Sequence, residues 1–426
     1  MSMPRVQPFS WLEKYDQRLL QKKVNNGYVS QTPTSMENND EEIFIDFRKS
    51  EQGELVIKLK DLKPRDPKVK NRVKKLDDKH KNVLMIFIDT LSRNEFHRKY
   101  PKTRKIMKKY LHLNKSPKIR AYEFFRLHSI RSYTFPNIFG SSYGVLYQDW
   151  NQPKLKRIES YAKDAGYITG MGVDMCSYSE SEVRGSATAP DKYNDDLDPD
   201  HLFLQIGCDY NLFNPNDQWA MGLERGPYTA GRNCFLGRDI VEINTDYAFQ
   251  FFETYKEDRK FYNMRIVSAH EYTGENNWYI DEALGAFLGK LDKAGHLEET
   301  ITMIYSDHGQ HIDTFLWHTR SGYAEMVNPV MTMMVPASLG EQILGNLEAN
   351  QQRLITHYEI FRTVVRYWGQ PFGLKVAQGG DLLYGKIKVE QDCSAAKIYE
   401  MIECRCWFKN ATNAKDPWIK AAEWKA

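Results

Sequence analysis

The sequence predicts an α/β protein with a mainly parallel central sheet flanked by helices, and two observations support this fold class. Short apolar runs, each about the length of one strand, recur along the chain. Segments with apolar residues at helical spacing follow several of these runs, so strands and helices alternate. Such alternation is typical of parallel sheets whose strands are joined by right-handed helical crossovers.

The strongest predicted strand covers residues 82–89, where six consecutive apolar residues end in a carboxylate. This continuous hydrophobicity indicates a central strand that is covered on both faces. The same patterns predict further strands at 167–174, 261–269, 301–305 and 330–335, and helices at 153–165, 280–291 and 353–368.

Composition divides the chain into three parts. Residues 1–80 are mostly polar, with one strand-like pair at 42–45 and 55–59, and they predict an N-terminal arm with a small β segment. Residues 81–408 hold the alternating elements and form one large domain, in which 185–235 are rich in Asp, Asn, Pro and Gly and predict a loop-rich insertion. Residues 409–426 form a C-terminal tail.

Charge and hydropathy exclude some classes of protein. The formal net charge of +3 is too small to indicate nucleic-acid binding by itself. The chain has no run of eighteen apolar residues, and its start lacks the pattern of a signal peptide. Residues 98–120 contain ten Lys or Arg and no acid. This stretch is either an exposed helix face or a positive rim that attracts an anionic substrate.

The cysteine pattern leaves two states open. The six cysteines allow three disulfides, or they are reduced and buried thiols. Cys404 and Cys406 lack the spacing of a Cys-x-x-Cys zinc or redox motif. We expect Cys393, Cys404 and Cys406 to form disulfides rather than to bind zinc.

Polar side chains follow three of the predicted strands. Asp89 ends the first, His270 follows the strand at 261–269, and Asp307 with His308 follow the strand at 301–305. Parallel strands bring their carboxyl ends to one edge of a sheet, so we expect these side chains to meet. Thr134 stands two residues before a proline, which predicts a place at or near the start of a helix.

Four motifs in this order resemble a known family. They are FIDTLSR at 87–93, FFRLHS at 124–129, TFPN at 134–137 and YSDHG at 305–309. Together they resemble the eukaryotic domain-of-unknown-function 229 family, which is part of the alkaline phosphatase and sulfatase superfamily. The resemblance runs from about residue 80 to 408 and includes the C-terminal cysteines. It implies an alkaline phosphatase-like catalytic domain at 81–408.

The resemblance also implies roles for individual residues. A metal, zinc or manganese, is expected on Asp89, Asp307, His308 and Thr134, and Thr134 is also the expected nucleophile. His270, His311 and His318 are expected to contact the phosphoryl oxygens or to protonate the leaving group, and Asn137 to contact substrate. One metal site is expected. A second is allowed by the family, with three candidate ligands: Glu271, His311 and His318.

Thr134 occupies the place where sulfatases carry a Cys or Ser that is oxidised to formylglycine. Threonine cannot form that aldehyde, and Ile138 replaces the Arg of the sulfatase motif. We therefore expect a metal-dependent phosphotransferase or phosphodiesterase that acts on a phosphorylated glycan or lipid through a covalent phosphothreonine. The alternatives are an inactive structural or binding subunit and a sulfatase-like hydrolase.

The same resemblance implies a secretory-lumen or extracellular protein near a membrane, either as a trimmed ectodomain or as a soluble member. Sequons at Asn114 and Asn410 are compatible with that route. No nucleic-acid partner is expected.

Overall fold

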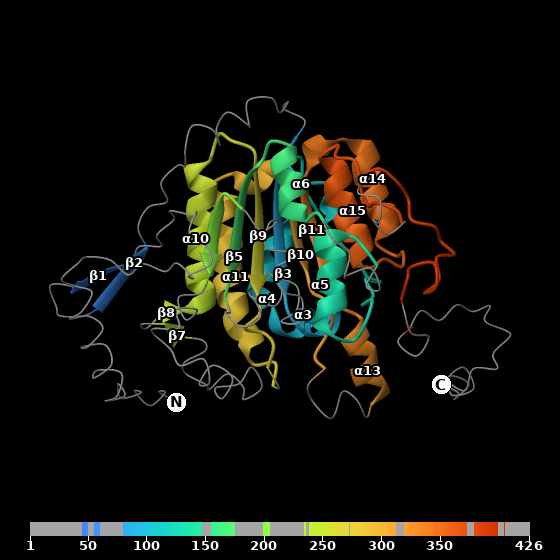
Figure 1. Cartoon of the computed structure of the whole chain (residues 1–426), viewed down its shortest axis with the longest axis horizontal. Helices are drawn as coiled ribbons and strands as arrows, with labels where there is room; N and C mark the ends of the chain where they lie inside the picture. Colours follow the sequence, from blue (N-terminus) through green and yellow to red (C-terminus); the bar gives the residue numbers. More distant parts are fainter. Residues whose placement is uncertain are drawn as a thin grey trace.

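The computed structural model describes residues 45–49, 55–59, 80–146, 155–174, 199–204, 234–235, 238–271, 273–311, 319–372, 379–398 and 404. At its centre lies a seven-stranded sheet (Figure 1). In order across the sheet, the strands are β4 (Ile119–Glu123), β11 (Met331–Pro336), β10 (Thr300–Tyr305), β3 (Asn82–Ile88), β9 (Lys260–Ile266), β5 (Ile168–Val173) and β6 (His201–Leu204).

The predicted mainly parallel sheet is confirmed. The five strands from β10 across to β6 all run parallel to one another. β11 is antiparallel to both β10 and β4, so the sheet is mixed at this end. β3 lies among the parallel strands and is buried along its whole length, as its unbroken apolar run predicts.

Helices cover both faces of the sheet (Figure 1). Leu84, Ile86 and Ile88 of β3 point to one face and pack with residues of the helices there. These helices are α3 (Arg93–Lys99), α4 (Pro101–Lys109), α10 (Ile240–Thr254) and α11 (Asn276–Lys293). The intervening β3 residues point to the other face, where the helices are α5 (Thr134–Tyr143), α6 (Ile158–Asp164), α14 (Glu341–Asn350) and α15 (His357–Tyr367). Alternation of side chains along each strand therefore builds two cores.

Smaller elements complete the described chain. An antiparallel hairpin of β1 (Ile45–Lys49) and β2 (Leu55–Leu59) confirms the strand pair expected near the N-terminus, with the first strand a few residues later than predicted. The remaining elements are β7 (Cys234–Phe235), β8 (Arg238–Asp239), α13 (Arg320–Val327) and the 3₁₀ turns His112–Asn114, His296–Glu299 and Ala337–Leu339. None of the helices in the described ranges has both the length and the hydropathy needed to cross a bilayer.

Two stretches differ from their predictions. Most of the expected insertion at 185–235, and all of the tail at 409–426, lie outside the described residues. Within that insertion, however, β6 pairs with β5 and extends the main sheet, so this part is not a loop. β4 lies at the end of the basic stretch 98–120, where no strand was predicted.

Half of the ten basic residues in this stretch pair with acidic side chains of described residues. Lys102 pairs with Glu282, and Lys109 pairs with Asp292 at 3.0 Å. Both acids belong to α11, against which α4 packs. Exposed pairs such as these contribute little stability, but they neutralise charge locally. The structure therefore favours an exposed helix face over a positive rim.

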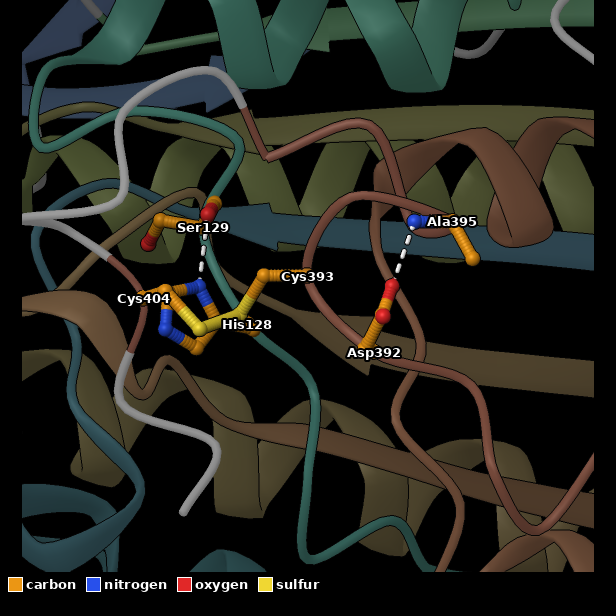
Figure 2. Close-up of a disulfide and its surroundings, with 6 residues drawn as sticks. All are labelled: His128, Ser129, Asp392, Cys393, Ala395 and Cys404. Carbon is orange, nitrogen blue, oxygen red and sulfur yellow. Dashed lines mark hydrogen bonds between the residues drawn. A yellow bond between two sulfur atoms is a disulfide. The ribbon is translucent and has the colours of Figure 1, made fainter. Parts of the chain in front are cut away.

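A disulfide links Cys393 to Cys404, with 5.9 Å between their Cα atoms (Figure 2). It lies in a small apolar cluster with Leu354, Ala396 and Ile398. This pair confirms disulfide formation for two of the three C-terminal cysteines. The third, Cys406, lies outside the described residues.

Candidate metal and nucleophile site

The ends of three neighbouring strands form the site. β10, β3 and β9 are adjacent and parallel, so their carboxyl ends lie at one edge of the sheet. Asp89 follows β3 directly, and its N–H donates to the carbonyl of Ile266, the last residue of β9, at 2.9 Å. Loops that leave this edge are where open α/β sheets place ligands.

The structure brings three of the predicted ligands together. Asp89, Asp307 and His308 each offer one ligand atom, and these atoms all lie within 4.8 Å of one another. All three side chains are completely buried. Two buried carboxylates beside an imidazole form an arrangement that a cation would stabilise strongly.

The two oxygens of Asp307 have different surroundings. Oδ1 accepts hydrogen bonds from the N–H groups of Thr90, at 3.1 Å, and His308, at 2.8 Å. Oδ2 accepts no hydrogen bond from any described residue. Burial raises the pKa of this carboxyl group, and the two backbone N–H groups oppose that shift. Oδ1 is thus fixed by the backbone, whereas Oδ2 has no hydrogen-bond partner among the described residues.

The imidazole of His308 is held with one nitrogen directed at the site. Its Nδ1–H donates to the carbonyl of Gly309 at 2.7 Å, which leaves the lone pair on Nε2. Burial lowers the pKa of His308 to about 4, so the ring is neutral at pH 7. Nε2 lies 3.1 Å from Oδ2 of Asp307, and a cation between these two acceptors would turn a repulsive contact into coordination. The oxygen and nitrogen donors fit zinc or manganese.

Thr134 is the first residue of α5, directly after the N-cap residue Tyr133. Its side chain is buried, and Oγ1 lies 3.1 Å from Nε2 of His308. The free N–H groups and the dipole at a helix N-terminus favour negative charge on such an oxygen. The structure therefore places the predicted nucleophile beside the predicted ligands.

Two further predicted histidines line the same edge. The ring of His311 lies 4.4 Å from that of His308 and 5.1 Å from that of His270, nearly perpendicular to the former. Burial is the main cause that lowers the pKa of His311 to about 3, and the neighbouring His308 is the second cause. The ring of His311 thus lies near both His308 and His270. The remaining candidate, His318, lies outside the described residues.

The side chains of two other predicted site residues form hydrogen bonds with nearby backbone groups. The Asn137 amide oxygen accepts from the N–H groups of Ile130 and Arg131, and its nitrogen donates to the carbonyls of Arg131 and Tyr133. The amide of Asn137 thus fixes the turn before α5, and the expected contact of Asn137 with substrate stays a prediction.

The carboxylate of Glu271 is used in a similar way. One oxygen accepts from the N–H and the hydroxyl of Thr273, and the other accepts from the N–H of Asn276 at the start of α11. Glu271 therefore holds this turn, and its expected part in a second metal site stays a prediction.

Hydroxyl groups beside the ligands were missed by the sequence reasoning. Ser306 Oγ accepts from the N–H of Leu91 and donates to the His308 carbonyl, both at 2.9 Å. Ser129 Oγ donates to the Asp307 carbonyl at 2.9 Å, and Thr90 also contacts Asp307. Only their position inside the four motifs at 87–93, 124–129, 134–137 and 305–309 could have pointed to these hydroxyl groups.

Gly309 follows Asp307 and His308 directly, and the backbone of another element approaches it closely. A Cβ atom at this position would lie 2.2 Å from the carbonyl oxygen of Glu325. Only glycine therefore fits between the loop after β10 and the end of α13.

Solved structures resemble the chain at low sequence identity. The lipoteichoic acid synthase LtaP from Listeria monocytogenes is 16% identical, with a TM-score of 0.44 over 75% of this chain and 81% of that one. The C-terminal periplasmic domain of EcEptC from Escherichia coli, in complex with Zn, is 12% identical, with a TM-score of 0.47 over 74% of this chain and 90% of that one. A protein in the alkaline phosphatase superfamily from Vibrio parahaemolyticus is 14% identical, with a TM-score of 0.46 over 74% of this chain and 72% of that one.

No curated protein matches the chain. One family model does match, and it covers residues 221–368, a segment that includes β9, β10 and β11 with His270, Asp307 and His308. Its description is "Protein of unknown function (DUF229)". This match confirms the resemblance to the domain-of-unknown-function 229 family that the four motifs predicted.

Proposed function

We propose that the chain is a metal-dependent phosphotransferase or phosphodiesterase that acts on a phosphoester of a glycan or lipid, with Thr134 as the nucleophile. One observation carries this proposal. The Thr134 hydroxyl lies at the N-terminus of α5 and 3.1 Å from His308, within a buried group of two carboxylates and an imidazole. A residue at a helix start does not need buried carboxylates and an imidazole beside it, whereas activation of its hydroxyl does.

Asp89, Asp307 and His308 would hold the cation, and Thr134 would complete the set. A divalent cation at this point would lower the pKa of a nearby hydroxyl and neutralise charge on phosphoryl oxygens. The chain's own groups fix the geometry around it, because Oδ1 of Asp307 and Nδ1 of His308 are both tied to the backbone. A pre-organised ligand set of this kind favours one orientation of the phosphoryl group.

The reaction divides into two displacements at phosphorus. The Thr134 hydroxyl loses its proton to solvent and attacks, a new Oγ–P bond forms, and the bond to the leaving oxygen breaks. His270 would protonate that oxygen. In the second step a glycan, lipid or water hydroxyl attacks the phosphothreonine and restores Thr134. The ring of His311 lies 4.4 Å from that of His308, and this imidazole would accept the proton of the incoming hydroxyl.

Substitution of Thr134 tests the nucleophile. With bis(p-nitrophenyl) phosphate and added zinc or manganese, Thr134→Ala should lose about a thousandfold or more in kcat. Folding should persist, because a residue at a helix start contributes only about 0.5–2 kcal/mol. Thr134→Ser should stay within about tenfold of the unaltered protein, because its hydroxyl survives. Acid-quenched turnover should leave a phosphoryl group on Thr134, detected by peptide mass spectrometry.

The rival functions predict different results. Normal turnover by Thr134→Ala, or cleavage of sulfate esters alone, would exclude the proposed mechanism. An inactive structural subunit would retain no metal after dialysis. Metal that remains bound to the unaltered protein, and is lost from Asp307→Asn, would exclude this second rival, since the change replaces a ligand carboxylate by a neutral amide.

The Cys393–Cys404 disulfide supports an oxidising location, in line with the proposed secretory or extracellular site of action.

A further inference from the structure

Thr90, the residue after Asp89, has an unusual backbone conformation. Its φ angle is +55°, and its side chain is buried. Only two other non-glycine residues in the described ranges have positive φ angles, Lys115 and Lys397, and both are exposed. A β-branched residue rarely adopts this conformation, because its side chain crowds the backbone. Such an outlier persists only where the surrounding structure holds it.

Two hydrogen bonds hold Thr90 in place, one on each side of β3. Its N–H donates to Oδ1 of Asp307, beyond the end of β10, at 3.1 Å. Its hydroxyl donates to the carbonyl of Ala269, beyond the end of β9, at 3.0 Å. Thr90 therefore connects the loops that follow three adjacent strands, and these loops carry Asp89, Asp307 and His270.

The side chain and the backbone of Thr90 make separable contributions. Glycine adopts a positive φ without strain, and it would still donate its N–H to Asp307. The contact that only the hydroxyl supplies is the one to Ala269, the residue before His270. The hydroxyl therefore fixes the turn in which Asp89 is presented to Asp307, at the expense of a strained backbone.

We propose that Thr90 is a positioning residue for the cation site. Its hydroxyl anchors the strained turn after β3 to the loop after β9, and this anchor keeps Asp89 and Asp307 directed at one point. The inference rests on the proposed function, because it assumes that these carboxylates bind a cation. Thr90 itself contacts neither the cation nor the substrate.

The test compares variants that separate the hydroxyl from the backbone strain. Thr90→Gly removes both, Thr90→Ser keeps the hydroxyl, and Lys115→Gly removes a positive-φ side chain far from the site. Zinc affinity is measured by competition with a chelator, and unfolding of the metal-free proteins is followed by circular dichroism. Thr90→Ala is a second variant without the hydroxyl, in case Thr90→Gly fails to fold.

Thr90→Gly should bind zinc about 10–100-fold more weakly than the unaltered protein, which is the usual effect of losing a group that orients metal ligands. Its metal-free form should still unfold cooperatively. Thr90→Ser and Lys115→Gly should bind zinc with the affinity of the unaltered protein, within about threefold of it. A merely structural hydroxyl would change the unfolding midpoint and leave zinc affinity unchanged.

Two negative results have different meanings. If the unaltered protein binds zinc and Thr90→Gly or Thr90→Ala binds it equally well, the positioning role is excluded and the proposed function stands. If the unaltered protein binds neither zinc nor manganese, the proposed function fails, and the inference about Thr90 fails with it.

Discussion

Buried ionisable side chains serve two different purposes in this protein. At the carboxyl edge of the sheet, Asp89, Asp307 and His308 are buried together, and their donor atoms converge. Lys260, at the start of β9, is also buried, but its ammonium group faces backbone carbonyls instead of other ionisable ligands. Clustering, rather than burial alone, thus separates a candidate site from a structural charge.

Lys260 supplies a prediction about pH. Its Nζ donates to the carbonyls of Tyr255, at 2.7 Å, and Asp258, at 3.0 Å, just after α10. Burial is the main cause that lowers the pKa of Lys260 to about 7, and the positive charge of Arg259 is the second cause. Because the unfolded chain holds this proton up to about pH 10.4, it binds more protons than the folded protein above pH 7. The free energy of unfolding should therefore rise by about 2–3 kcal/mol from pH 7 to pH 9.5.

The measurement is urea unfolding of the unaltered protein and of Lys260→Met across this pH range. The methionine variant should lose the rise, because it has no proton to release. Buried tyrosines act in the opposite direction, but only near and above their ordinary pKa of about 10. Equal pH slopes for the two proteins would show that Lys260 remains charged when buried.

The sequence predicted the site where residue type and strand position together were sufficient. Asp89 directly follows β3, Asp307 and His308 come two and three residues after the end of β10, and parallel strands bring such residues to one edge. The roles of Asn137 and Glu271 could not be predicted in the same way. The sequence shows that an amide or carboxylate side chain can form hydrogen bonds. It does not show that nearby backbone groups are the partners in those bonds.

At the scale of elements, the position of α5 is fixed at its C-terminal end as well as at its first residue, Thr134. Its C-cap, Gly144, has a φ angle of +66°, and a Cβ atom there would lie 2.1 Å from the ring of Phe361 in α15. Both the conformation and the close packing therefore require glycine. The contact fixes the helix that carries the proposed nucleophile against its neighbour.

Gly144→Ala should lower the free energy of unfolding by about 2–4 kcal/mol, from backbone strain together with overpacking against Phe361. The matched control is Gly345→Ala, within α14, where a Cβ atom would meet nothing within 4 Å. That variant should gain about 0.5–1 kcal/mol, since alanine favours a helix. Urea unfolding measures both changes, and equal values for the two variants would contradict the packing argument.

Long apolar elements were easier to predict than short edge elements. β3, with its unbroken apolar run, and α11, with its regular apolar stripe, lie where the sequence placed them. β4 and β6 are short strands at the two ends of the described sheet, and each pairs with one named strand of that sheet. Their sequences carry less hydrophobic signal, and pairing with the rest of the sheet decides their structure.

At the scale of the whole molecule, the alternation of strands and helices predicted the layers but not every strand direction. β11 carries the same kind of apolar run as β10, yet the two strands are antiparallel. Hydrophobic pattern shows that a strand is buried, whereas the path of the connecting chain sets its direction. The α13 segment between them shows that a helix can also join antiparallel neighbours.

The C-terminal disulfide is a covalent constraint that the sequence predicted without its pairing. Cys393 and Cys404 are 11 residues apart, and their bond closes this segment against Leu354, just before α15. Figure 2 shows His128 and Ser129 in its surroundings, and Ser129 donates to the carbonyl of Asp307.

Reduction of this disulfide should lower the free energy of unfolding by about 2–3 kcal/mol, because the unfolded chain regains the entropy of a short closed loop. Urea unfolding with and without a reductant measures the effect. The matched control is the double variant Cys393→Ser and Cys404→Ser, whose stability should equal that of the reduced protein and should not change with reductant. If the reductant destabilises this variant as well, another disulfide carries the effect. If it destabilises neither protein, the bond does not constrain the fold, and its support for an oxidising compartment is lost.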